Sequence, residues 1–188
     1  MGIEPLELAC TSTRGVLANV TPEQLDLPTP CASWQVRNII NHLVGLTHWF
    51  ATGITTGVTP PQPDETNYAD GDFLTAYDGG IQDSLAAFKA PGALDRTVKL
   101  PFGEFPGTMF LALATNDTFT HGWDVAKATG QSTDLNRELA EQVLAQARAA
   151  IPDQFRGADG TAPFGPIVEV ADAAPAADRL AGFLGRTP

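Results

Sequence analysis

Apolar residues recur at the three- and four-residue spacing of an amphipathic helix along most of this chain. The spacing predicts helices over residues 4–19, Ser33 to Gly53, Asp72 to Pro91, Gly107 or Thr108 to Gly130, and Asp134 to about Ala150. Amphipathic helices become stable when their apolar faces pack against one another. The pattern therefore predicts an all-α fold, a four-helix bundle with long connections and a short C-terminal extension.

Local signals set the expected ends of these helices. Ser33 follows a Pro-Thr-Pro segment at 28–30, which disfavours helix, and is the expected N-cap of the second helix. We expect Trp34 to anchor the start of this helix against the core. Thr108 is the corresponding N-cap of the fourth helix. Paired glycines at 79–80 in the third helix predict a bend or a close contact with another helix.

Two connections stand out by composition. Residues 52–71 are rich in Gly, Pro, Thr and Asp, which predicts a surface loop of about twenty residues. Residues 95–106 predict a short extended segment or a hairpin around Phe102-Gly103.

The residues after Ala150 are rich in Gly, Pro and Ala, and we expect one extended piece at 166–170 and one short helix at 177–184. The length of the chain suits one buried core. We therefore expect a single helical-bundle domain over residues 1–188, with residues 151–188 packed on the bundle as an extension.

The fourth helix carries charged side chains on the face that should be apolar. At 100° per residue, Asp117, His121 and Asp124 fall on the same stripe as Phe110 and Val125. A buried carboxylate is costly unless it is paired, hydrogen-bonded or bound to a metal. This face therefore needs polar partners from a neighbouring helix.

The second helix offers one such partner. The chain has three histidines. His121 lies on the fourth helix, and the other two, His42 and His48, lie on different faces of the second helix. His42 flanks the apolar stripe of the second helix and can reach a neighbour from the edge of the core, whereas His48 lies well away from it. His42 is thus the expected partner of Asp117 and His121.

Two imidazoles and one carboxylate suit a divalent metal. Zinc is the expected metal because it binds borderline-soft imidazole nitrogen and an anionic oxygen well, and these three ligands leave a fourth position for water or substrate. The same ligands also occur at non-haem iron sites, and nickel is compatible with them. Asp124, one turn beyond His121, is the expected support for an imidazole N–H. The same residues are also compatible with a buried hydrogen-bond network without metal. A general base is not evident, and His48, Asp124 and Glu104 are the candidates.

The net charge and the sequence at the start of the chain disfavour binding to nucleic acid and to membranes. The formal net charge of -11 disfavours binding to nucleic acid or an anionic membrane surface. The start, MGIEPLELAC, lacks the basic and apolar regions of a signal peptide, and no apolar run approaches a membrane span, so we expect a cytoplasmic protein.

Cys10 and Cys31 are too few for a disulfide framework or a zinc-thiolate site and are expected to be packing residues. Joint ligation by Cys31 and His42 is not expected.

Two phrases carry a family resemblance: PTPCASWQVRNIINHLVG at 28–45 and NDTFTHGWDVAKATG at 116–130. They resemble metal-binding helical proteins related to the N-terminal domain of mycothiol-dependent maleylpyruvate isomerase and, more distantly, the DinB-like four-helix bundles. The tail FGPIVEVADAAPAADRLAGFLGRTP resembles the ending of a single-domain branch of that family.

The resemblance implies a metal held by His42, Asp117 and His121, and a low-molecular-weight thiol such as mycothiol as a second cofactor. In the isomerase the carboxylate is a glutamate, so Asp117 is a shorter ligand. The isomerase also carries a further C-terminal domain that contributes to its thiol chemistry, and the residues after Ala150 are too few for it.

These observations lead to one hypothesis and two alternatives. The leading hypothesis is a metal-dependent enzyme of low-molecular-weight thiol chemistry, a thiol S-transferase or isomerase acting on a small electrophile. One alternative is a non-catalytic small-molecule or protein binding module with a structural or absent metal. The other is a metal-dependent hydrolase. The expected partner is a small-molecule substrate, and a bundle of this size is compatible with a homodimer.

Overall fold

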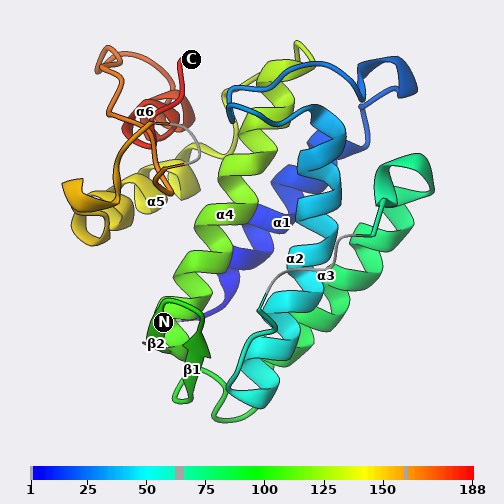
Figure 1. Ribbon diagram of the computed structural model, residues 1–188, viewed down its shortest axis with the longest axis vertical. Coiled ribbons are helices and arrows are strands. Elements are labelled where there is room, and N and C mark those ends of the chain that lie inside the picture. The colour runs from blue at the N-terminus through cyan, green and yellow to red at the C-terminus, as the bar shows by residue number, and fades with distance from the viewer. Residues whose placement is uncertain (1, 62–65, 159–160) are drawn as a thin grey trace.

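Four long helices form a bundle along the longest axis of the molecule (Figure 1). The structure is a computed structural model and describes residues 2–61, 66–158 and 161–188. The helices are α1 (Glu4–Leu17), α2 (Val36–Thr56), α3 (Phe73–Lys89) and α4 (Gly107–Ala128). The predicted all-α fold is confirmed, and each long helix lies where the apolar spacing placed it.

The bundle consists of two parallel pairs. In the pair of α2 and α3, Asn41 accepts a hydrogen bond from the backbone of Ala69 near the start of both helices, and Thr47 lies against Gly80 further along. In the pair of α1 and α4, the Thr13 hydroxyl donates to the carbonyl of Thr118. Parallel neighbours need long connections, which explains the loop between α2 and α3.

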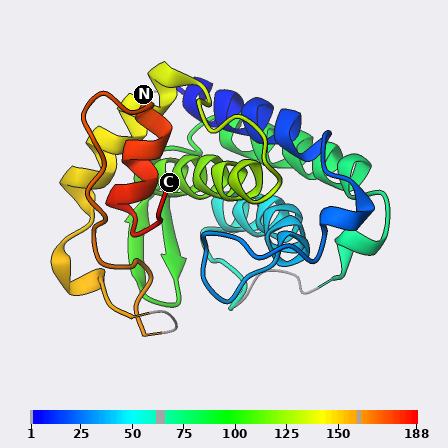
Figure 2. The ribbon, with the colours of Figure 1, turned by 90° about the horizontal axis from the view of Figure 1, so that it is seen from above.

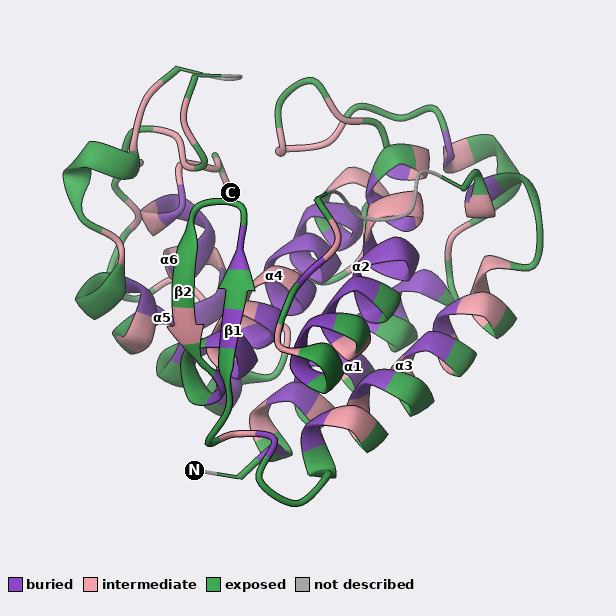
Figure 3. Ribbon diagram, turned by 60° about the horizontal axis from the view of Figure 1, so that its bottom comes forward, coloured by how far each residue is buried: buried purple, intermediate pink, exposed green. Residues whose placement is uncertain are grey.

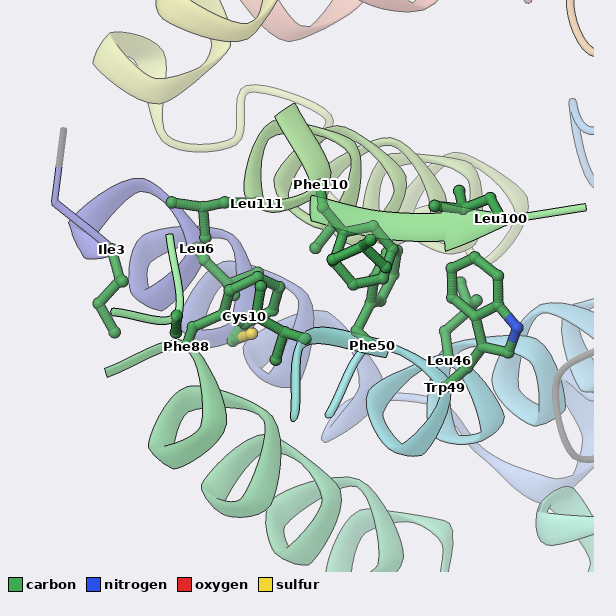
Figure 4. Packing of buried hydrophobic residues seen from close by; sticks show 14 residues of the cluster. Ile3, Leu6, Cys10, Leu46, Trp49, Phe50, Phe88, Leu100, Phe110 and Leu111 are labelled. Atoms are coloured by element: carbon green, nitrogen blue, oxygen red, sulfur yellow. The ribbon is translucent and has the colours of Figure 1, made fainter. Parts of the chain in front are cut away.

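The lower end of the bundle contains an aromatic core. Phe50 of α2 and Phe110 of α4 have ring centroids 5.0 Å apart, and Trp49 and Phe88 pack against Phe110 (Figure 4). Leu6 and Cys10 of α1 close the same cluster. In Figure 3 the sides of the helices that face the middle of the bundle are mostly coloured as buried, and exposed residues lie on the outer sides of α1, α2 and α3. Helix α4 is buried without interruption from Thr118 to Ala126.

A short hairpin covers this end of the bundle. Strands β1 (Thr97–Leu100) and β2 (Gly103–Pro106) pair antiparallel, with Leu100 opposite Gly103, which confirms the predicted hairpin. The chain passes directly from β2 into α4, where the Gly107 N–H donates to the Arg96 carbonyl. The expected N-cap Thr108 is therefore wrong: Pro106 takes that position, because the hairpin leads directly into the helix two residues before the sequence signal.

The start and end of α2 also differ from the prediction. Ser33 is not the N-cap, because it has a φ of 67° in the loop before the helix. Gln35 takes the N-cap position, and its N–H donates to the Asn38 side chain. The helix continues one turn past Gly53 to Thr56 and stops at Gly57, whose φ of 81° suits glycine.

The predicted loop at 52–71 is thus shorter than expected, because its first residues are helical. It also contains a 3₁₀ turn, Tyr68–Asp70, and part of it, residues 62–65, lies outside the described residues. The third helix begins as predicted, with Asp72 as a side-chain cap for the Thr75 N–H. Within the described residues, no helix has the length and apolar character needed to cross a membrane.

The last two helices form a separate layer beside α4. These are α5 (Arg137–Ala150), which starts three residues later than the predicted Asp134, and α6 (Ala176–Phe183). Seen from above, they lie on one side of α4, with α2 and α3 on the other (Figure 2). Residues 166–170 do not form a strand, although the Val168 N–H donates to the Gly182 carbonyl. Trp123 of α4 donates to Asp178 and joins the layer to the bundle.

Candidate metal centre

His42 of α2 meets Asp117 and His121 of α4 near the upper end of the bundle. The Nε2 atoms of both histidines lie 3.2 Å from the same oxygen, Oδ1 of Asp117. The His42 and Asp117 side chains are each 21% exposed, and that of His121 is 11% exposed. The three side chains singled out from the sequence are therefore adjacent in space and accessible from one side.

Trp34 packs over both imidazoles. Its ring centroid lies 4.7 Å from that of His42 in an edge-on contact and 5.4 Å from that of His121 in a stacked contact. The aromatic surface restricts the rotation of both rings. The sequence predicts a packing role for Trp34 at the start of α2, and its contact with both imidazoles adds a role in the site. Its position eight residues before His42 carries no periodic signal, because residues 31–35 are not helical.

The fully buried Asp124 continues the cluster on the far side of His121. Its Oδ2 lies 3.0 Å from His121 Nδ1, and it accepts two hydrogen bonds from Arg186, at 3.2 Å from Nε and 3.1 Å from Nη2. His42, Asp117, His121, Asp124 and Arg186 thus form a row in which carboxylates alternate with basic groups, here called the charged row. Arg186 is not among the site residues predicted from the sequence.

The charged row explains how carboxylates tolerate burial. Burial by itself raises the pKa of Asp117, but the charges of His42 and His121 bring it well below its usual range. Burial also opposes charge on His121, yet Asp117 and Asp124 raise the pKa of its imidazole to about 9. The pKa of Asp124 is lowered against its burial by His121 and Arg186. In the metal-free protein, the raised pKa therefore keeps the His121 imidazole protonated at neutral pH.

The charged row borders a pocket of about 490 Å³. His42, Asp117, His121 and Arg186 reach its surface, whereas Asp124 is covered. The other walls of the pocket come from the loop before α2, from α4 and from the C-terminal extension. They are formed by Pro30, Cys31, Ala32, Trp34, Leu113, Asn116, Thr120, Gly157, Ala158, Ala162, Pro163, Phe164, Gly165, Pro166, Leu184 and Gly185. A mostly apolar pocket with a few convergent polar groups is the usual form of a small-molecule site.

The remaining sequence candidates lie in different places. His48 is exposed on α2, as predicted, and Glu104 is exposed on β2 at the hairpin. Neither lines the pocket. Cys10 is buried in the lower core, and burial raises the pKa of its thiol to about 12. Cys31 lines the pocket, where its sulfur lies within 4.8 Å of one side-chain nitrogen of His121 and one carboxylate oxygen of Asp124.

The donor atoms fit a small divalent metal. One ligand atom from each of His42, Asp117 and His121 lies within 4.8 Å of the other two. Around a tetrahedral zinc with bonds of about 2.0–2.1 Å, neighbouring ligand atoms are about 3.3 Å apart. The two 3.2 Å separations at Asp117 Oδ1 match that spacing. Three protein ligands beside an open pocket are typical of a catalytic rather than a structural site.

Comparison with known proteins gives a family and close relatives. Residues 6–126 match the family described as the mycothiol maleylpyruvate isomerase N-terminal domain. Two proteins of Mycobacterium tuberculosis, the uncharacterized proteins MT0763 (strain CDC 1551 / Oshkosh) and Rv0738 (strain ATCC 25618 / H37Rv), are each 42% identical over 173 residues. Each alignment covers 92% of this chain and 90% of the relative.

Solved structures show the same fold at lower identity. The crystal structure of the mycothiol-dependent maleylpyruvate isomerase superimposes with a TM-score of 0.61 at 16% identity, and a histidine-to-alanine mutant of it with a TM-score of 0.55 at 13% identity. Each superposition covers 76% of this chain but 66% of the isomerase chain. The bundle is therefore shared, and part of the isomerase has no counterpart in the alignment.

Proposed function

Because the chain belongs to the mycothiol maleylpyruvate isomerase N-terminal domain family, we propose that it is a metal-dependent enzyme of low-molecular-weight thiol chemistry. The reaction is thiol S-transfer or thiol-assisted isomerisation of a small electrophile. The observation that carries the proposal is the 3.2 Å spacing of both imidazole Nε2 atoms from one carboxylate oxygen beside an open pocket.

His42, Asp117 and His121 would hold the metal, and zinc fits their donor set best. When bound, a divalent metal supplies Lewis acidity that lowers the pKa of a thiol or a water molecule. The thiol of the structurally similar isomerase is mycothiol, and we propose a thiol of that kind here.

The protein's own side chains prepare the site for that chemistry. Trp34 fixes the orientation of the two imidazoles. Asp124 accepts a hydrogen bond from His121 Nδ1, which leaves Nε2 for the metal once its proton has gone. The apolar walls of the pocket exclude water around the reacting groups, which strengthens electrostatic interactions there.

The metal itself is tested by substitution. Purified protein loaded with zinc should contain one metal per chain by elemental analysis. His42→Ala and His121→Ala should each lose it, because two ligands are too few for stable retention. His48→Ala is the matched control, since His48 lies on the same helix but is exposed. Retention of one metal per chain by His121→Ala would place the metal elsewhere.

Activity is tested with defined probes. Zinc-loaded protein with mycothiol should isomerise maleylpyruvate or conjugate the thiol to monochlorobimane, and His121→Ala should abolish this turnover. Turnover of an ester without thiol would identify a hydrolase instead. Ligand binding without any turnover would identify a binding module. Turnover that is unchanged in His121→Ala would remove the metal from the mechanism.

A further inference from the structure

The C-terminal extension sends one charged side chain back into the bundle. Arg186 lies beyond α6, and its side chain is only 11% exposed. Its backbone N–H donates to the Ala181 carbonyl, and Nη1 donates to the Leu184 carbonyl. Arg186 is therefore fixed by its own segment as well as by Asp124.

The backbone beside Arg186 is held by a close approach of two glycines. Gly185 has a φ of 90°, which suits glycine, and a Cβ at this position would lie 2.5 Å from the Cα of Gly165. This contact joins residues 184–186 to the part of the extension that lines the pocket. The glycine contact thus fixes the backbone from which the Arg186 side chain reaches Asp124.

Asp124 depends on this guanidinium. The carboxylate is completely buried, and within the described part of the chain its side-chain partners are His121 and Arg186. A buried carboxylate with one partner removed keeps its desolvation cost and loses its compensation. Without Arg186 the carboxylate would turn toward another partner or become protonated, and in either case His121 Nδ1 would lose its fixed acceptor.

We propose that Arg186 is a positioning residue of the metal centre, which fixes the His121 imidazole by holding Asp124. The expected effect of Arg186 on metal affinity rests on the proposed function. The orientation of the His121 imidazole by Asp124 and Arg186 does not require a metal. Residues 6–126 match the family, so this role belongs to a part of the chain that the family match does not cover.

Metal affinity gives the first test. Zinc competition with a chromophoric chelator should show about 10–100-fold weaker binding in Arg186→Met, the usual loss when support for a ligand is removed. Arg186→Lys keeps the positive charge but cannot make the two hydrogen bonds of the guanidinium, so its zinc affinity should lie between those of wild type and Arg186→Met. The control is Arg179→Met, because Arg179 lies in α6 and pairs with Glu141 rather than Asp124. Equal affinities in wild type and Arg186→Met overturn the proposal.

A double-mutant cycle separates positioning from general stability. If Arg186 acts through Asp124, then Arg186→Met should cause no further loss of affinity in an Asp124→Asn background. Additive losses would show that Arg186 acts by another route and would overturn the proposal. Thermal melting of each variant identifies any that fail to fold, and Arg186→Lys then carries the comparison.

The third test needs no metal. In ¹⁵N NMR spectra of metal-free protein, the His121 Nδ1–H should appear as a downfield, slowly exchanging resonance, and it should shift and exchange faster in Arg186→Lys and Arg186→Met but not in Arg179→Met. If wild type binds no zinc, the proposed function fails while this test still decides the role of Arg186. An unchanged His121 resonance overturns the proposal.

Discussion

At the scale of single residues, the site is an alternation of charges. Each carboxylate of the charged row lies between two basic groups, so that neither Asp117 nor Asp124 is buried without compensation. A divalent metal at Asp117 would replace the proton that His121 holds there. Metal binding and proton release are therefore coupled at this site.

The raised pKa of His121 predicts a pH-dependent stability of the metal-free protein. Its pKa is about 9 in the folded state against an ordinary value of 6.5, so the folded state binds this proton more tightly. The resulting stabilisation is complete below pH 6.5 and is lost as the pH rises through about 9. The free energy of unfolding should fall across this window by at most about 1.4 kcal/mol per pH unit.

Urea unfolding at a series of pH values measures this slope. His121→Gln should flatten it, while the exposed His48→Ala should leave it unchanged. A wild-type slope that equals the slope of His121→Gln would show that the folded state does not hold His121 charged.

At the scale of elements, small residues set how closely helices approach. A Cβ at Gly80 of α3 would lie 1.9 Å from Thr47 Oγ1 of α2, whereas a Cβ at Gly79 would meet nothing within 4 Å. Of the two features predicted for this pair of glycines, the structure shows the close helix contact. The side chain of Thr47 also donates to the Val44 carbonyl, so it cannot move away freely.

The two neighbouring glycines therefore predict opposite effects of the same substitution. Gly80→Ala should destabilise the protein by about 1–3 kcal/mol, because the added methyl overpacks the contact between α2 and α3. Gly79→Ala should stabilise it by about 0.5–1 kcal/mol, because alanine is the better helix former at an exposed position. Denaturant unfolding of both variants checks this, and equal effects would contradict the close contact.

At the scale of the whole molecule, the α5–α6 layer has its own apolar core. Leu139, Val143, Leu144 and Leu180 pack in a cluster that reaches the bundle through Phe119 and Trp123 of α4. The two helices contact each other more extensively than they contact α4. A layer of this kind can open while the bundle stays folded.

Native-state hydrogen exchange should show this difference in the metal-free protein. Amides of α5 and α6 should exchange before those of the buried central part of α2 and α4. Leu180→Ala should speed exchange in α5 and α6 selectively, since it leaves a cavity in their shared core at a cost of about 2–5 kcal/mol. Leu8→Ala in α1 is the control, because Leu8 is 45% exposed. Uniform exchange over all six helices would contradict a separate layer.

The sequence by itself determined the helices, because their signal is local. The periodic apolar positions placed all four bundle helices, and the position of charges on that period selected Asp117, His121 and Asp124 for attention. His42 was within reach because its place on the stripe of α2 also follows from the period. Helix ends were less accurate at Ser33 and Thr108, because the neighbouring turn and hairpin fix the backbone there.

Only the tertiary structure decided which distant residues complete the site. Trp34 comes from a loop without periodicity, and Arg186 meets Asp124 across 62 residues of chain. Their roles depend on how the loop before α2 and the C-terminal extension fold over the bundle, and no pattern along the chain records such long-range contacts. Periodicity identifies the face of a helix, whereas packing determines what that face meets.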